Sequence, residues 1–310
     1  MTRSQLPQLN HVSTELERNT AGLPDRLTLI IESVVADLEA GRHVFVSGSA
    51  GTGKSVLVRN VTRILAERTR RTCALTAPTG IAAKNIGGRT CHSYFGITQG
   101  VSNYIGHRPK VPRDMEGVAP SKLPACVVVD EVSMARRDLF DAIASTLRLV
   151  NDKRWAGPGL KVPMLAVGDF FQLPPVTPSS QRPELEEAYP GTHDFLACDA
   201  QSWERMDFRC YELTDPLRQS GDRGYFDALN VVRHGGTDGI EALRWIVEHA
   251  RNWALSGASR IYGVNREVDA YNERMLREDP LAIGDTIEFH SHTHRVRYSA
   301  DGEDLSRNWD

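Results

Sequence analysis

A glycine-rich segment in the first fifth of the chain has the composition of a phosphate-binding loop. It reads Gly48-Ser49-Ala50-Gly51-Thr52-Gly53-Lys54-Ser55, which is the pattern G-x-x-x-x-G-K-[ST]. Glycines let backbone N–H groups turn toward phosphate oxygens, and a helix that begins here adds positive potential. The pattern predicts that Lys54 contacts the β- and γ-phosphates of a nucleoside triphosphate and that the Ser55 hydroxyl is a ligand of Mg²⁺.

Two adjacent carboxylates follow a second apolar run. Val127–Val129 precedes Asp130 and Glu131. A carboxylate at the end of a buried strand can hold Mg²⁺ through water, and its neighbour can orient or deprotonate an attacking water. Such a pair alone often only caps a helix. Beside a phosphate loop it indicates that Asp130 serves the metal and Glu131 the water, which favours hydrolysis.

The elements that position these residues alternate between strand and helix. Four short apolar runs indicate strands buried on both faces: Val44–Val46, Cys73–Leu75, Cys126–Val129 and Met164–Val167. Helical spacing of apolar residues alternates with them, from Pro24 to Gly41 before the first run and along Leu139, Ile143, Leu147 and Val150 between the third and the fourth. This alternation predicts an α/β fold with a parallel sheet and helices on both faces, in which ligands lie beyond the carboxyl ends of the strands.

The chain divides into three parts. Residues 1–22 have little periodicity and are predicted to be a loose arm, 23–212 the first domain, and 213–310 part of a second α/β domain. Within the first domain, 98–125 and 177–194 are predicted to be surface insertions.

Composition excludes several classes of protein. The 310 residues are 40% hydrophobic and 25% charged, which excludes wholesale disorder. A net charge of -3 excludes a protein that coats nucleic acid by bulk attraction, though it is compatible with a local basic groove. The sequence lacks a long apolar segment and a secretory signal, and its five cysteines have no metal-binding spacing, so free thiols and a cytoplasmic location are expected. Cys73, Cys91 and Cys126 are expected to be buried.

Three further segments narrow the class. They are Thr76-Ala-Pro78-Thr79-Gly80, Gly87-Gly-Arg-Thr-Cys-His92-Ser-Tyr-Phe95 and Gly168-Asp-Phe-Phe-Gln172-Leu-Pro-Pro175. With the phosphate loop they resemble the Pif family of helicases, RecD-like members of superfamily one. The similarity extends in motif order over residues 44–275, through Leu213–Gln219, Phe226–Gly235 and Tyr262–Asn272.

The resemblance implies an ATP-dependent DNA helicase that moves 5′-to-3′ on single-stranded DNA. The fold would be a RecA-like ATPase domain followed by the start of a second one. The cofactors would be ATP and Mg²⁺, and the partners single-stranded DNA and DNA duplex junctions, in repair, recombination, replication or telomere maintenance. The sequence leaves the oligomeric state open.

The resemblance also assigns roles to single residues. Lys54 and Glu131 would be catalytic, Gln172 would sense the γ-phosphate, and Arg218 would contact it from the other motor half. Six residues would contact the DNA: Thr76, Pro78, Thr79, Gly80, His92 and Phe95, the last as a stacking platform. Phe170 and Phe171 are expected in the core.

The chain departs from the family at two points. No glutamine lies near Ile30, where relatives read the adenine edge, and the Q-G-x-T and Ser-Arg segments of the second motor half do not occur. The chain is therefore expected to bind nucleotide but to unwind duplex poorly. Two alternatives remain open: a nucleotide-switched module that binds single-stranded DNA without unwinding, and a phosphate-loop kinase, which Glu131, Gln172 and 76–80 disfavour. His290, His292 and His294 are interpreted as a solvated strand face.

Overall fold

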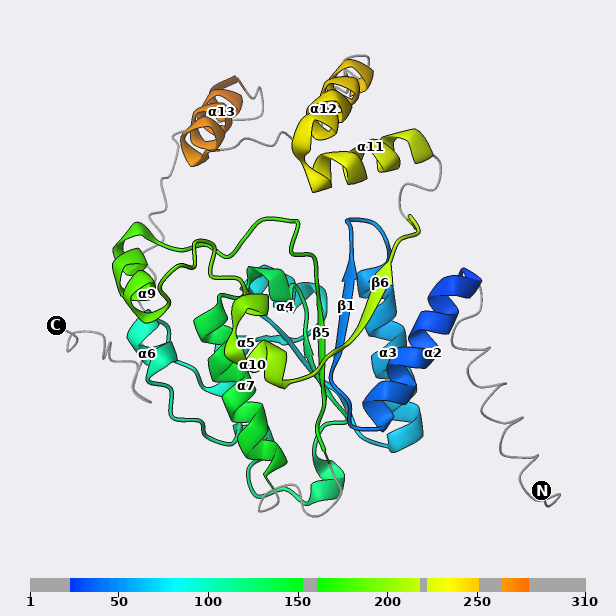
Figure 1. The fold of residues 1–310 in the computed structure, drawn as a ribbon, viewed down its shortest axis with the longest axis vertical. Coiled ribbons are helices and arrows are strands. Elements are labelled where there is room, and N and C mark those ends of the chain that lie inside the picture. Colours follow the sequence, from blue (N-terminus) through cyan, green and yellow to red (C-terminus); the bar gives the residue numbers. More distant parts are fainter. Residues whose placement is uncertain (1–22, 153–160, 218–221, 251–263, 279–310) are drawn as a thin grey trace. The chain divides into compact units, whose positions relative to one another are not determined.

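The computed structural model describes residues 23–152, 161–217, 222–250 and 264–278 (Figure 1). Its contacts divide the chain into two compact units, 1–252 and 253–310. Of the second unit, the described part is helix α13 (Asn265–Glu278) with the residue before it. The predicted arm and the three histidines lie outside the described residues, and the predicted domain boundary at residue 213 stays a prediction. None of the described helices is long and apolar enough to cross a membrane.

Six parallel strands form the sheet of the first unit. Their order is β3-β2-β4-β5-β1-β6, and each neighbouring pair runs parallel. The strands are β1 (Val44–Gly48), β2 (Ala74–Ala77), β3 (Arg89–Thr90), β4 (Val127–Val129), β5 (Met164–Gly168) and β6 (Arg209–Leu213). The predicted α/β class and the four predicted strands are confirmed.

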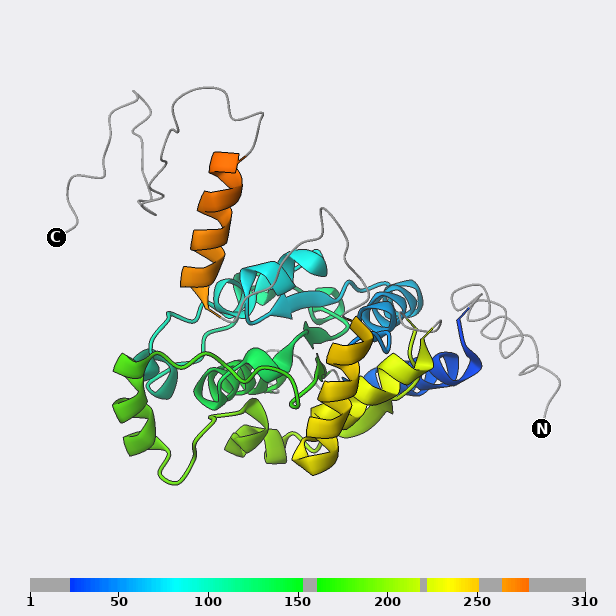
Figure 2. The ribbon, with the colours of Figure 1, turned by 90° about the horizontal axis from the view of Figure 1, so that it is seen from above.

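Alternating side chains of the central strands pack on two separate cores. Val127 and Val129 point into one core and Val128 into the other, as the two-residue period of a strand requires. The first core joins α5 (Cys91–Phe95), α7 (Arg137–Asn151) and α10 (Gln201–Arg205). The second joins α2 (Asp25–Glu39) and α3 (Lys54–Thr69). Figures 1 and 2 show these helices on opposite faces of the sheet, which confirms the expected layering.

The remaining helices are short or follow the sheet. They are α4 (Gly80–Asn85), α6 (Val101–Ile105), α9 (Arg182–Ala188), α11 (Arg223–His234), α12 (Gly236–Ala250) and the single turns η1 (Arg113–Met115), η2 (Pro120–Lys122), η3 (Val132–Met134), η4 (Ser179–Gln181) and η5 (Ala197–Asp199). The predicted insertions 98–125 and 177–194 are largely irregular but not confined to the surface. Val101 and Met115 are buried in the first insertion and Leu185 in the second.

All five cysteines are free thiols. Cys91 and Cys126 are buried as expected, whereas Cys73 is half-buried. Burial raises the pKa of the Cys91 thiol to about 12, so this side chain is an uncharged part of the core.

Candidate nucleotide-binding site

Three neighbouring strands deliver the predicted chemistry to one edge of the sheet. β5 lies between β1 and β4, so the phosphate loop after β1, the acidic pair after β4 and the Gln172 segment after β5 emerge side by side. Residues from all of these line one cavity of about 820 Å³, including Ser55, Asp130, Glu131 and Gln172. The cavity lies beyond the carboxyl ends of parallel strands, where open α/β sheets bind their ligands.

Glycine is required at particular positions of the loop. Gly51 and Gly53 have φ angles of 83° and 100°, a region that side chains with a Cβ atom disfavour. A Cβ atom on Gly48 would lie 2.6 Å from the Thr52 hydroxyl and 2.9 Å from the Leu213 Cβ. The loop therefore has its turn and its close packing on β6 because of these glycines, and it leads directly into α3 at Lys54.

Lys54 folds over the loop. Its Nζ atom donates to the carbonyl oxygens of Gly48, at 2.7 Å, and Ser49, at 3.2 Å. Burial lowers the pKa of Lys54, and the carboxylates of Glu131, Asp169 and Asp130 oppose that shift. The ammonium group is thus held between the loop and the acidic residues, close to where the pattern places phosphate.

The acidic pair has unusual electrostatics and backbone geometry. Asp130 is 6% exposed, and its burial, together with the neighbouring charge of Glu131, raises its pKa to about 6. Glu131 has a φ angle of 52°, which is rare for a residue other than glycine and costs on the order of 1–3 kcal/mol. Strain of this kind clusters at functional sites, so it is consistent with the predicted role of Glu131, which stays a prediction.

The oxygen atoms at this edge suit a hard cation. Ser55 offers a hydroxyl and Asp130 a carboxylate at the same cavity, and Mg²⁺ takes such ligands while keeping water and phosphate oxygens in its other positions. No group of three or more histidine, cysteine, aspartate or glutamate side chains in the described ranges could hold a metal ion. A site that borrows most of its ligands from a nucleotide is consistent with both observations.

Gln172 is hydrogen-bonded to Asp169, a residue for which no role was predicted from the sequence. Its Nε2 atom donates to Oδ2 of Asp169 at 3.1 Å, while its side chain is exposed at the cavity. Asp169 also pairs with Arg233 of α11, with 2.8 Å between Nη2 and Oδ1. Asp169 follows β5 as Asp130 follows β4, and this shared position was the signal that could have identified it.

The predicted DNA track is divided between surface and interior. Pro78 and Thr79 are half-buried and Gly80 is exposed, and Thr79 lines the cavity. Thr76 does not fit the prediction, because it is fully buried and its hydroxyl donates to the Val128 carbonyl at 2.6 Å. It belongs to β2, so its backbone and hydroxyl are already used within the sheet.

Aromatic residues near the track also differ from expectation. Phe95 is 2% exposed and packs in the core with Tyr94, so it offers no face on which a base could stack. His92 is half-buried and shares a hydrogen bond with the Tyr104 hydroxyl; burial and the charge of Arg136 lower its pKa. Phe170 packs against the core as expected, but Phe171 is 60% exposed.

Two further expectations concern the rim of the site. Arg218 lies outside the described residues. The adenine-reading glutamine that the resemblance implies would lie near Ile30. Ile30 lines a small hollow beside the loop together with Leu27, Thr52, Leu213 and Leu217. None of the residues around that hollow is a glutamine.

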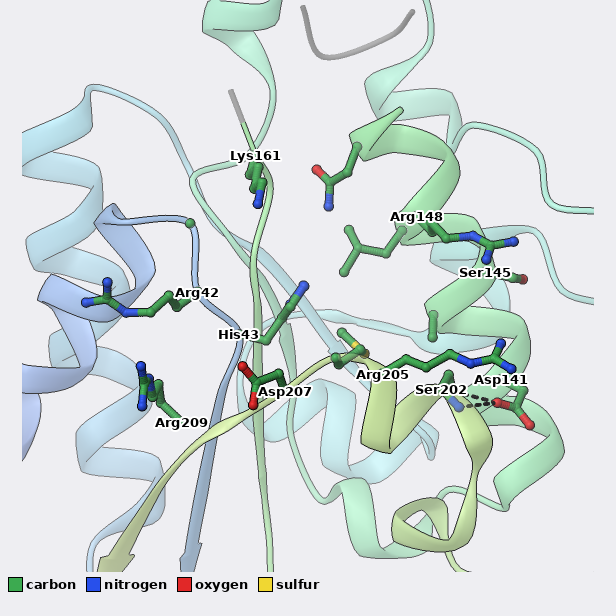
Figure 3. Close-up of a pocket in the computed structure, with 15 residues that line it drawn as sticks. Arg42, His43, Asp141, Ser145, Arg148, Lys161, Ser202, Arg205, Asp207 and Arg209 are labelled. Atoms are coloured by element: carbon green, nitrogen blue, oxygen red, sulfur yellow. Dashed lines mark hydrogen bonds between the residues drawn. The ribbon is translucent and has the colours of Figure 1, made fainter. Parts of the chain in front are cut away.

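A second cavity, of about 490 Å³, lies at the amino ends of the strands (Figure 3). His43 precedes β1 there, and burial lowers its pKa to about 4, so its Nδ1 atom accepts the Met164 N–H at 2.9 Å as a neutral ring. In Figure 3 the guanidinium groups of Arg42 and Arg209 point away from that of Arg148. These charges do not converge on one ligand, and the cavity lies at the opposite edge from the phosphate loop.

Known proteins match the chain over the region just described. The family model of PIF1-like helicase matches residues 25–230. The ATP-dependent DNA helicase PIF1 of Candida albicans is 32% identical over 270 residues, which are 84% of this chain and 28% of that protein. The ATP-dependent DNA helicase RRM3 of Saccharomyces cerevisiae is 30% identical over 297 residues, 93% of this chain and 37% of that protein.

A solved structure matches the fold as well. The crystal structure of the Pif1 helicase from Bacteroides in complex with ADP-AlF3 and single-stranded DNA has a TM-score of 0.62 and 29% identity. The match covers 84% of this chain and 58% of that one. Of the PIF1 of Candida albicans and the RRM3 of Saccharomyces cerevisiae, the chain spans about a third of the length.

Proposed function

The chain belongs to the PIF1-like helicase family, and on that premise we propose that it couples ATP hydrolysis to movement on single-stranded DNA and to duplex unwinding. One observation supports this above the others. The phosphate loop, the acidic pair and Gln172 meet at one cavity, and Thr79 of the predicted DNA track lines the same cavity. Loss of the γ-phosphate would therefore take place in the same cavity that borders the proposed path of the single-stranded DNA.

The residues divide the chemistry among them. The loop amides and Lys54 bind and orient the β- and γ-phosphates. Ser55 and Asp130 would hold Mg²⁺, which neutralises phosphate charge when it is bound. Glu131, held in its strained conformation, accepts a proton from the attacking water, and Gln172 reports whether the γ-phosphate is present.

The DNA partners follow from the family and from the track. We propose that single-stranded DNA lies along Pro78, Thr79 and Gly80, with movement from 5′ to 3′ and duplex junctions as the sites of unwinding. His92 contributes by fixing α5 against α6 through its hydrogen bond with Tyr104. Contacts of Pro78, Thr79 and Gly80 with DNA phosphates would orient the DNA strand without reading its sequence.

Steady-state ATP hydrolysis by the 310-residue chain, with and without single-stranded DNA, tests the proposal. We expect DNA to stimulate hydrolysis, Lys54→Ala to lower the stimulated rate by about 100-fold or more, and Glu131→Gln to abolish turnover while nucleotide still binds. A forked duplex with a 5′ single-stranded tail then tests unwinding, including the poor unwinding expected because the Q-G-x-T and Ser-Arg segments do not occur in this sequence. A 3′-tailed fork is the matched control for direction.

Each result separates the proposal from its alternative. Hydrolysis that DNA does not stimulate, in a chain that still binds the strand, would favour the nucleotide-switched binding module. Hydrolysis that persists in Lys54→Ala would mean that the phosphate loop is not the site. Unwinding of the 3′-tailed fork alone would contradict the proposed direction.

A further inference from the structure

An ion pair joins helix α11 to the carboxyl end of β5. The guanidinium of Arg233 lies 2.8 Å from Oδ1 of Asp169 through Nη2, and its Nε lies 3.2 and 3.1 Å from Oδ1 and Oδ2. The two side chains are 13% and 1% exposed. A two-pronged contact of this kind fixes orientation as well as charge.

The same carboxylate also holds the phosphate-sensing segment. Oδ2 of Asp169 accepts from the Gln172 side chain at 3.1 Å, and Oδ1 accepts from the Phe171 backbone N–H at 3.1 Å. The Gln172 backbone N–H donates to the Asp169 carbonyl at 3.0 Å. Arg233 and Gln172 are therefore linked through a single side chain, so a displacement of either changes the hydrogen bonds of the other.

Two residues at the end of α11 also contact the exposed Phe171 ring beside Gln172. The Arg233 guanidinium lies 4.5 Å from the centre of the Phe171 ring, and the His234 ring lies 5.2 Å from it. Cation–π contacts at this distance are favourable. They hold the exposed Phe171 ring beside Gln172, and α11 in turn packs along α12.

The pair lies next to the phosphate site. The charges of Asp169 and Arg233 act on Lys54 in opposite directions, the first raising its pKa and the second lowering it. A nucleotide adds negative charge at this point, which attracts both cations and the Gln172 amide. Since a ligand shifts a conformation by its different interactions with two states, the Asp169 contacts are where such a shift would begin.

We propose that Arg233 is a positioning residue that orients Gln172 through Asp169 and carries the state of the nucleotide site to helices α11 and α12. This inference rests on the proposed function, in which Gln172 senses the γ-phosphate. Arg233 contacts the sensor's partner and not the nucleotide, so its loss affects turnover and the response of the helices more than nucleotide affinity.

Hydrogen exchange of residues 223–250 in the 310-residue chain, with and without a non-hydrolysable ATP analogue and Mg²⁺, tests the inference. The variants are Arg233→Gln and Arg233→Lys, with Arg223→Gln as the control, because Arg223 forms an exposed pair with Asp227 on the same helix. We expect the analogue to change the protection of α11 in the unsubstituted chain and in Arg223→Gln, but not in Arg233→Gln. The dissociation constant of the analogue should stay within about threefold while kcat of DNA-stimulated hydrolysis falls by about tenfold with little change in KM.

The outcomes are distinguishable. An analogue that fails to bind the unsubstituted chain overturns the proposed function and this inference with it. A bound analogue that changes α11 equally in Arg233→Gln and the unsubstituted chain overturns the inference alone. If Arg233→Gln does not fold, Arg233→Lys decides, since it keeps the charge and loses the fork: a reduced response supports the inference and a full response contradicts it.

Discussion

The proposed role of Asp130 requires a buried charge that lowers the stability of the folded chain. The pKa of Asp130 is raised to about 6 in the folded chain, above that of an unfolded aspartate. The charged carboxylate therefore destabilises the folded state at pH 7. We expect Asp130→Asn to increase the free energy of unfolding by on the order of 1–2 kcal/mol at pH 7 without nucleotide or Mg²⁺. The difference should shrink between about pH 6 and pH 4, because the unsubstituted chain then takes up a proton at this site. Urea denaturation across this pH range measures it.

Asp169 provides the matched control. It is another buried aspartate directly after a central strand, but it carries Arg233 as a partner. Asp169→Asn leaves that guanidinium unpaired, so we expect a loss of stability at pH 7, opposite in sign to Asp130→Asn. Two losses of similar size would contradict the view that Asp130 is an unfavourably buried charge.

Residue types were easier to predict than residue surroundings. Asp130 and Gln172 were predicted to share a site because each follows a strand in a pattern that needs its chemistry, and both line one cavity; their roles stay predictions. Thr76 and Phe95 were misassigned because a motif fixes order along the chain, and it does not say which side of a strand or short helix is covered. Arg233 lies in the Phe226–Gly235 segment of the family resemblance but received no role, since its partner lies 64 positions earlier.

Helix α4 begins at a single side-chain cap. It has six residues, and the Thr79 side chain accepts the Ala82 backbone N–H at 3.2 Å. A helix this short has little stability of its own. We expect Thr79→Ala to lower the free energy of unfolding by about 1 kcal/mol and to speed hydrogen exchange at residues 80–85, whereas Thr79→Ser retains the cap. Equal exchange in the two variants would contradict the capping role.

Strand prediction succeeded in the centre of the sheet and failed at its edges. The four predicted strands have neighbours on both sides, so they are apolar runs that stand out from polar turns. Edge strand β6 reads Arg-Cys-Tyr-Glu-Leu, with three of its five side chains exposed, and β3 has only two residues. Neither has the composition by which a buried strand is recognised, although β6 closes the phosphate loop through Leu213.

At the scale of the whole molecule, the candidate site is formed by the segments that follow three neighbouring strands. The phosphate loop follows β1, the acidic pair follows β4 and Asp169 follows β5. Each segment carries charged or polar groups that can bind an anion or a cation. Lys54 lies among three carboxylates and Asp130 is raised in pKa. Burial disfavours the charges of both Lys54 and Asp130. The phosphates of a nucleotide would offset the first and its metal the second, so binding should increase the stability of the first unit.

Ligand binding should therefore raise the melting temperature through the phosphate loop and the metal together. At a nucleotide concentration of 100 times Kd, binding to the folded state alone contributes about 2.7 kcal/mol, or roughly 5–11 °C for a unit of this size. We expect Mg²⁺ with a non-hydrolysable ATP analogue to give such a shift, EDTA to remove most of it, and Lys54→Ala to show almost none. Asp130→Asn should begin from a higher melting temperature and gain less, because it has no buried charge for the metal to relieve. Calorimetric scans of the three chains measure these shifts. A full EDTA-insensitive shift would mean that the nucleotide binds without the metal that Ser55 and Asp130 are proposed to hold.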